Sequence, residues 1–281
     1  LFTYMADANT RTFSQEFNVS GSSDSTQWVA GVYYLNIRND TLQGLPFASN
    51  GLLNGGATTP GLDFTTEVGL KTNSYSVYGQ IDQKLSEQFS IIVGGRYIHE
   101  RKNYTFAQNA YVNLDETRIE NDVLAFPVAQ PPGANPFARK FNQNLWAGKA
   151  QLEFRPQDGV LLYAGVNRGV KAGSVNGPLA DGSTVTADQL IYRPEVLLSY
   201  EGGFKLKLMG GDLRINGSAY FYDYKDYQVF TFVNVSGVVS NEKAKIKGVE
   251  LEVVAAPVQG LTISVSGSYN DASVKGLEFA P

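Results

Sequence analysis

The residue types that most readily do chemistry are scarce in this sequence. It contains one histidine, His99, which precedes Glu100, and it has no cysteine. A metal centre or an acid–base site needs several such groups that converge on one point. We therefore interpret His99–Glu100 as a solvated strand end, and we expect no catalytic residue, no metal site and no cofactor.

Charged side chains recur at alternate positions between apolar neighbours, as Lys205 does between Phe204 and Leu206. This pattern fits either an ordinary sheet with one wet face or a membrane barrel with a polar lumen. A charge that faces hydrocarbon costs about 2–4 kcal/mol at the bilayer midplane, so charges confined to one face favour the lumen. The side chains predicted to face the lumen are Arg96, Lys149, Glu153, Arg155, Glu201, Lys205, Lys207, Arg214, Glu250 and Glu252.

A dense tyrosine cluster lies near one end of an expected strand and has two interpretations. One is a girdle at the membrane interface, where amphipathic rings sit at headgroup depth. The other is a wall on which a ligand stacks. We favour the girdle, or packing against a loop. The cluster consists of Tyr220, Tyr222, Tyr224 and Tyr227.

Composition excludes several classes of protein. The 281 residues have a net charge of −4, with no basic concentration suited to nucleic acid. No window approaches 18 apolar residues, which excludes a transmembrane helix but not a β-barrel, whose strands alternate apolar and polar residues. The first eight residues lack the charged start and apolar run of a signal peptide, so we expect the natural N-terminus to lie upstream.

The elements that must position these residues are β-strands, because apolar residues recur with a period of two. The clearest case is 261–270, where Leu261, Ile263 and Val265 alternate with Ser264 and Ser266. Many of the segments are long enough to cross a bilayer at a tilt. The sequence predicts ten strands near residues 12–20, 26–37, 70–84, 88–102, 140–155, 160–172, 194–208, 212–230, 241–256 and 260–273.

The connections between these strands alternate in length. The short ones are rich in Gly, Pro, Ser and Asp, as tight hairpins require. Outer-membrane barrels have short turns at the periplasmic end and long loops outside. The pattern therefore predicts an up-and-down barrel, with short turns at 20–25, 86–87, 156–159, 209–211 and 257–260, and long loops at 39–69, 103–139, 173–193 and 231–240.

The period of two also predicts which face each side chain takes. We expect Phe204, Leu206, Leu261, Ile263 and Val265 to face lipid. We expect Glu201, Lys205, Ser264 and Ser266 to face the lumen. Ten strands of a wider barrel cannot close on themselves without changing their tilt, so the sheet should be open, with its first and last strands unpaired.

The order of several motifs resembles the barrel strands of TonB-dependent outer-membrane receptors. Each motif is weak by itself, but their order and spacing are specific, and the resemblance covers nearly the whole chain, 1–281. The matching stretches read YSVYG at 75–79, GGRY at 94–97, LYAGVNRGVKAG at 162–173, RPE at 193–195, SYEGGFK at 199–205, AYFYDYKD at 219–226 and KGVELE at 247–252.

The resemblance implies an all-β, antiparallel transmembrane barrel of about 22 strands that is plugged by an N-terminal domain. These 281 residues would supply about ten of the strands as one partial barrel domain, without the plug and the TonB-contacting segment. The C-terminal residues do not end on the aromatic residue usual for barrel proteins, so we expect both ends to be truncated.

The implied function is uptake of a scarce nutrient across the outer membrane of a Gram-negative bacterium, coupled to the TonB complex through the plug. A ferric siderophore is the default substrate, and haem, cobalamin, an oligosaccharide or an aromatic compound stay open. Recognition is expected in the long loops. The aromatics Tyr104, Phe106 and Tyr111 are the candidate ligand contacts, although packing within the loop is the alternative we favour slightly.

Two other functions remain open at this point. A complete ten-stranded barrel enzyme, such as an outer-membrane protease, would need clustered acids with a histidine at the outer rim, and the sequence offers one histidine. A passive porin would need an open lumen without a plug.

Overall fold

The computed structural model describes residues 5–45, 62–112, 123–127, 137–176, 190–233 and 236–276, and nearly all of them lie in β-strands. None of the helices within these ranges is long and apolar enough to cross a membrane. The strands of the main sheet are β1 (Met5–Ser22), β2 (Thr26–Leu45), β3 (Leu62–Lys84), β4 (Phe89–Val112), β6 (Phe137–Phe154), β7 (Val160–Lys171), β10 (Glu195–Leu208), β11 (Leu213–Val233), β12 (Ser236–Val258) and β13 (Leu261–Lys275).

These strands form one antiparallel sheet in which each pairs with its neighbours in this order. A short strand, β5 (Val123–Pro127), pairs with β4 beside this path, and β8 (Ser174–Val175) pairs with β9 (Ile191–Tyr192) in a separate hairpin. The ten strands predicted from the sequence are therefore confirmed. A short 3-10 helix, η2 (Met209–Gly211), lies in the turn between β10 and β11.

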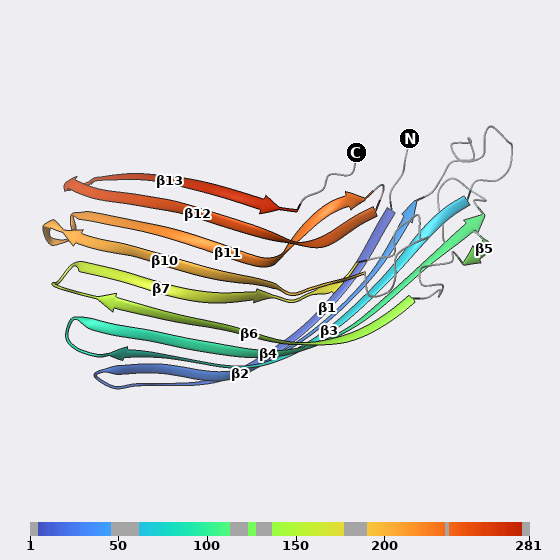
Figure 1. The fold of residues 1–281 in the computed structure, drawn as a ribbon, viewed down its shortest axis with the longest axis horizontal. Coiled ribbons are helices and arrows are strands. Elements are labelled where there is room, and N and C mark those ends of the chain that lie inside the picture. The colour runs from blue at the N-terminus through green and yellow to red at the C-terminus, as the bar shows by residue number, and fades with distance from the viewer. Residues whose placement is uncertain are drawn as a thin grey trace.

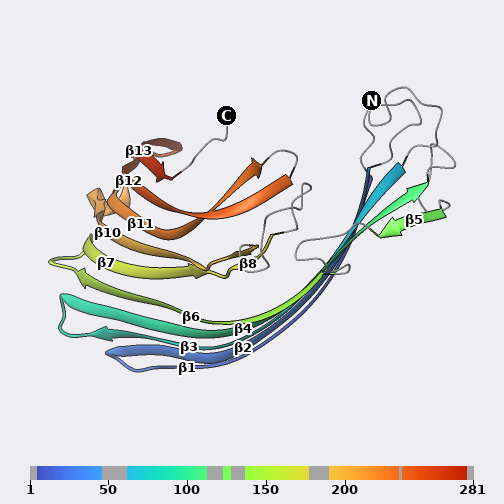
Figure 2. The same ribbon diagram turned by 45° about the vertical axis from the view of Figure 1, so that its right-hand side comes forward.

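The sheet is curved like a trough and open along one side (Figures 1 and 2). Its edges are β1 and β13, each with a single neighbour in the described ladder, as expected for part of a wider barrel. The short turns β1–β2, β3–β4, β6–β7, β10–β11 and β12–β13 lie at one end, on the left in Figure 1, which we call the turn end. The strand ends that lead to the longer connections lie at the opposite end, the loop end.

The strands continue further toward the loop end than the sequence predicted. β2 runs to Leu45. β4 runs to Val112, so residues 103–112 of the expected loop at 103–139 belong to a strand. The expected loop at 231–240 is wrong, because β11 and β12 stay paired as far as Val233 and Ser236. Residues 46–61, 113–122, 128–136 and 177–189 lie outside the described part of the chain.

The β8–β9 hairpin shows which face of the sheet is which. It lies within the curve of the sheet (Figure 2), where Val175 packs in a cluster with Tyr104 and Phe106 of β4. Even-numbered residues of β4 therefore point to the concave face. The antiparallel register carries this assignment to the other strands, because residues directly opposite one another share a face.

The register places the two predicted sets of residues on opposite faces of the sheet, and which face meets lipid stays a prediction. One concave row runs from Gly94 through Lys149, Asn167 and Ser199 to Tyr222. By alternation along β10, Glu201 and Lys205 are concave, whereas Phe204 and Leu206 are convex. On β13, Ser264 and Ser266 lie opposite Val254 and Glu252 on the concave side, so Leu261, Ile263 and Val265 are convex.

Between the turn end and the middle of the sheet, exposure is the reverse of that in a soluble protein. Convex apolar side chains are open, with Trp146 55% and Val77 55% exposed, whereas the concave Ser76 is 7% and Ser199 6% exposed. A band of exposed apolar side chains with polar residues behind it is the arrangement of a sheet whose outer face meets lipid.

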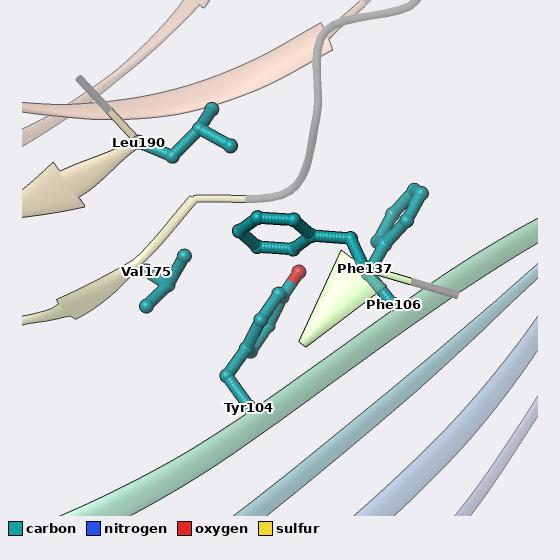
Figure 3. Packing of buried hydrophobic residues seen from close by; sticks show 5 residues of the cluster. All are labelled: Tyr104, Phe106, Phe137, Val175 and Leu190. Atoms are coloured by element: carbon teal, nitrogen blue, oxygen red, sulfur yellow. The ribbon is translucent and has the colours of Figure 1, made fainter. Parts of the chain in front are cut away.

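Toward the loop end the polarity of the two faces changes over. The concave face there carries the largest buried apolar cluster, in which Phe137 lies opposite Phe106 and its ring meets that of Tyr104 edge-on at 6.3 Å (Figure 3). Val175 and Leu190 cover these rings from the hairpin side. This end of the sheet therefore has a small interior of the ordinary soluble kind.

Polar contacts fix the described ends of the 173–192 segment on both sides of the trough. Gly173 accepts hydrogen bonds from Lys102 Nζ at 2.7 Å and Gln143 Nε2 at 2.9 Å. Across the trough, the Asn176 amide exchanges two hydrogen bonds with the backbone of Val239, at 2.8 and 2.9 Å. The hairpin thus links β4 and β6 to β12.

We expect Phe137→Ala to loosen this hairpin, because it removes a ring that is 4% exposed from the cluster. The local cost should be about 3 kcal/mol, as for other buried Phe→Ala changes. Hydrogen exchange at the Val239 amide, which donates to Asn176, should speed up, whereas Phe137→Leu should leave it near the parent rate. Equal exchange in all three proteins would contradict the packing described above.

The facing of β13 gives a second expectation. Val265 is 63% exposed on the convex face, halfway between the turn and Tyr269. In lipid vesicles, Val265→Lys should lower the free energy of unfolding by about 2–4 kcal/mol, because the charge would face hydrocarbon. Ser266→Lys is the matched control, and it should cost less than about 1 kcal/mol since it points to the wet side. Urea titrations of the full-length protein measure both, and a reversed ranking would invert the facing.

Candidate functional site

The charged residues predicted to face the lumen lie on the concave face of the sheet. Arg96, like Tyr104, is an even-numbered residue of β4 and therefore concave. Lys149 lies opposite the concave Gly94. Glu153 and Glu250 lie in one row across the sheet, with Tyr163, Gly203 and Ser218 between them. The remaining predicted strand positions fall on the same face by the same register, namely Glu201, Lys205, Lys207, Arg214 and Glu252. Arg155 lies one residue beyond the end of β6.

Neighbouring polar groups satisfy several of these charges. Glu153, which is 8% exposed, pairs with Arg155 at 2.6 Å. Tyr163 donates a hydrogen bond from its hydroxyl to Glu201 at 2.9 Å. Asn216 donates one to Glu252 at 2.8 Å. Contacts of this kind hold Glu153, Glu201 and Glu252 along the wall.

Arg96 borders a hollow in the concave wall of about 470 Å³. Its guanidinium lies 5.2 Å from the centroid of the Tyr33 ring and donates a hydrogen bond to Ser76 Oγ at 3.1 Å. Glu16 accepts a hydrogen bond from Tyr78 on the same wall. Glycines form much of the remaining lining, and Lys149 and Arg168 are also part of it, so the hollow combines three cations and one anion with open backbone.

The interpretation of the tyrosine cluster as a lipid-facing girdle is wrong for three of its members. Tyr220 lies opposite Glu201, and Tyr222 lies opposite Ser199, both on the concave face. Tyr224 shares their parity. The rings of Tyr220 and Tyr222 stack at 4.7 Å. The convex position between them is Phe221, which is 37% exposed. We call Tyr220, Tyr222 and Tyr224 the tyrosine wall.

Glycines on neighbouring strands allow the concave tyrosine rings to lie along the wall. A Cβ at Gly248 would come within 2.6 Å of the Tyr220 ring, and one at Gly203 within 2.8 Å of the Tyr163 ring. Such close approach has room only where the partner has no side chain. The rings are therefore half-buried and present their faces, with hydroxyls as polar handles, to the space enclosed by the sheet.

The candidate ligand contacts lie on β4 and not in a loop. Tyr104 is 5% and Phe106 6% exposed, both in the cluster beneath the hairpin. Burial raises the pKa of the Tyr104 and Tyr192 hydroxyls above the ordinary value, so both stay protonated further into the alkaline range. Tyr111 belongs to the described backbone of β4, but its side chain lies outside the described part. Ligand contact by these residues stays a prediction.

His99 and Glu100 point to opposite faces and cannot act as a pair. His99 Nδ1 lies 2.7 Å from Asn144 Oδ1 on the convex side. Glu100 is concave and pairs with Lys102 at 3.1 Å. In the ranges that the structure describes, no group of three or more metal-binding side chains comes together.

Three solved structures show the same arrangement of strands. The ferric yersiniabactin uptake receptor FyuA from Yersinia pestis aligns with a TM-score of 0.72 at 19% identity, covering 98% of this chain and 37% of its own. The siderophore receptor PiuA from Acinetobacter baumannii aligns at 0.65 and 16%, covering 95% and 39%. The copper transporter OprC aligns at 0.66 and 17%, covering 96% and 39%. The chain therefore spans less than two fifths of the length of these proteins.

The family model for the TonB dependent receptor-like β-barrel matches residues 2–279. This family consists of transport receptors of the Gram-negative outer membrane, and the enzyme alternative is therefore set aside. The match confirms the resemblance found in the motif order, and the chain belongs to the TonB-dependent receptor β-barrel family.

Proposed function

We propose that this chain forms part of the barrel wall of a receptor that takes up a ferric siderophore across the outer membrane. The observation that carries the proposal is the tyrosine wall, stacked ring faces and hydroxyls on the concave side of a sheet whose convex side suits lipid. An organic iron chelate offers flat or polar groups to such a wall. Energy would come from the TonB complex, through a plug domain elsewhere in the full-length protein.

Two further points support a chelate over a bare metal ion. FyuA, named as a ferric yersiniabactin uptake receptor, and PiuA, named as a siderophore receptor, have folds that align over nearly all of this chain. OprC is named as a copper transporter, but this chain has a single histidine and no cysteine to offer a soft metal ion. Recognition through ring faces and hydrogen bonds needs neither residue type.

We expect the double change Tyr220→Ala and Tyr222→Ala to weaken binding of the cognate ferric siderophore about ten-fold, or ~1.4 kcal/mol. The reason is the loss of a stacked pair of rings that faces the enclosed space. The measurement is binding and uptake of a panel of radiolabelled ferric siderophores by cells that carry the full-length receptor.

Phe221→Leu is the matched control, since it changes the residue between the two tyrosines on the opposite face. It should bind and transport like the parent at equal amounts in the membrane. Parent-like behaviour of the double variant would rule out the wall as a ligand surface. Uptake that persists in cells without TonB would favour a passive porin.

The contacts predicted for Tyr104, Phe106 and Tyr111 belong to the same proposal and are tested in the same assay. Tyr104→Ala and Tyr111→Ala should lower affinity, whereas Gln157→Ala, in the turn between β6 and β7, should not. If all three variants bind and transport like the parent, these aromatics serve packing alone.

A further inference from the structure

The convex face of β1, β2, β3, β4 and β6 carries a row of cations that uptake does not explain. Reading across the ladder, Arg11 lies opposite Arg38, Arg38 opposite Lys71, Lys71 opposite Asn103, and Asn103 opposite Lys140. At about 4.8 Å between strands, the row extends over roughly 19 Å. We call Arg11, Arg38, Lys71 and Lys140, together with Arg101, the basic belt.

Arg101 belongs to the next row toward the turn end, which contains no carboxylate. This row consists of Phe13, Asn36, Asn73, Arg101 and Asn142. Its asparagines supply amide donors and acceptors between the cations. All five cations of the basic belt are exposed.

The basic belt lies directly beyond a level of convex aromatic residues. Tyr34 and Tyr75 occupy the row next to that of Arg101, and Tyr97 and Trp146 occupy the one after it. The last three are about half exposed, at 48%, 50% and 55%. Tyr and Trp rings of this kind mark the depth of the lipid headgroups. The belt therefore lies at or just outside the headgroups, on the surface that faces the membrane.

The charge of the basic belt is not balanced within its rows. Like charges directly opposite one another on a sheet are destabilising. Arg38 has a partner in Asp40, at 2.7 Å, but both of its neighbours across the ladder are cations. Four residues of one sign in one row would repel less if multivalent anions lay against them, and Arg and Lys both bind phosphate well.

The other half of the convex face shows a different arrangement at a comparable level. Lys247 pairs with Asp271 at 3.2 Å, and Lys245 lies opposite Asp223. These two cations of β12 thus have carboxylates beside them on a neighbouring strand, whereas Lys243 of β12 lies opposite Lys275. The run of like charges is longer in the sector from β1 to β6, where Arg11, Arg38 and Lys71 lie directly opposite one another on successive strands, and this favours a site there.

We propose that the basic belt binds the phosphate groups of an anionic lipid headgroup in the outer leaflet, with the acyl chains lying against the apolar convex band below. The asparagines of the adjacent row would contact the sugar or other polar groups of the headgroup. The rings of Tyr97 and Trp146 would then lie at the junction between headgroup and chains. A free phosphate ion would use the same cations but would gain nothing from the apolar band.

The test uses the full-length receptor in detergent, with lipid A that carries both phosphates as the probe and its dephosphorylated form as the reference. The triple change Lys71→Gln, Arg101→Gln and Lys140→Gln should weaken binding of the phosphorylated lipid at least ten-fold. The matched control removes three cations from the other half of the same face, with Lys225→Gln, Lys245→Gln and Lys247→Gln. It should stay within two-fold of the parent.

A second variant keeps the charges in place, with Lys71→Arg, Arg101→Lys and Lys140→Arg, and it should bind within about three-fold of the parent. Folding of each variant is checked by the heat-induced shift of the barrel on a gel. If the glutamine variant does not fold, the proposal is tested by the salt dependence of lipid binding to the parent. The affinity of the parent for the phosphorylated lipid should fall steeply between low and high NaCl.

Several results would overturn the proposal. The glutamine variant could bind the phosphorylated lipid as the parent does, or the control could lose it equally. The parent could bind the dephosphorylated lipid just as tightly, or inorganic phosphate at millimolar concentration could displace the lipid fully, which would make the belt a site for free anions. A change in oligomeric state without a change in lipid affinity would assign the belt to contact with a second copy of the chain.

Discussion

The face that each side chain takes depends on one constraint, the unbroken antiparallel hydrogen-bond ladder. In hydrocarbon no water can satisfy the backbone, so each strand must pair along its length with its neighbours. Along the main path from β1 to β10, the described ladder contains no register shift. One side chain of known direction, Tyr104 against the hairpin, therefore fixes the direction of all the others, and a slip of one residue would turn lysines toward lipid.

The part of the fold that could be predicted from the sequence is the part that this constraint governs most strictly. Between the turns and the aromatic level, one face must be apolar and the other polar, and the alternation at 261–270 shows this directly. Beyond Tyr97 both faces meet water or a small interior, so the rule no longer applies. Polar residues such as Arg101 become convex and apolar ones such as Phe106 become concave. Because the alternation of apolar and polar residues is reversed beyond this level, we predicted a loop there, although the strand continues.

The tyrosine wall shows that a prediction from local composition can be wrong where the alternation along the strand indicates the correct face. Four tyrosines close together suggested an interfacial girdle, which is the commonest use of clustered tyrosine in a membrane protein. The alternation within the same strand contained the correct answer, since Leu213, Ile215 and Phe221 are odd-numbered whereas the three residues of the tyrosine wall are even-numbered. The contacts themselves could not be predicted, because the position of Tyr220 over Gly248 depends on the register between two strands.

The height at which the two faces exchange polarity follows from strand geometry. Phe89 stands at the turn end of β4, and Tyr97 stands at its aromatic level. The residues between them rise about 27 Å along the strand, or about 20 Å along the membrane normal at a tilt of about 40°. That is close to the apolar band of about 25 Å seen in outer-membrane barrels. The convex cations and the concave cluster around Tyr104 both begin within a few residues beyond this level. A single boundary, the outer surface of the membrane, therefore accounts for two features on opposite faces: outward side chains become charged because they leave the lipid, and inward side chains become apolar because the hairpin excludes water from them.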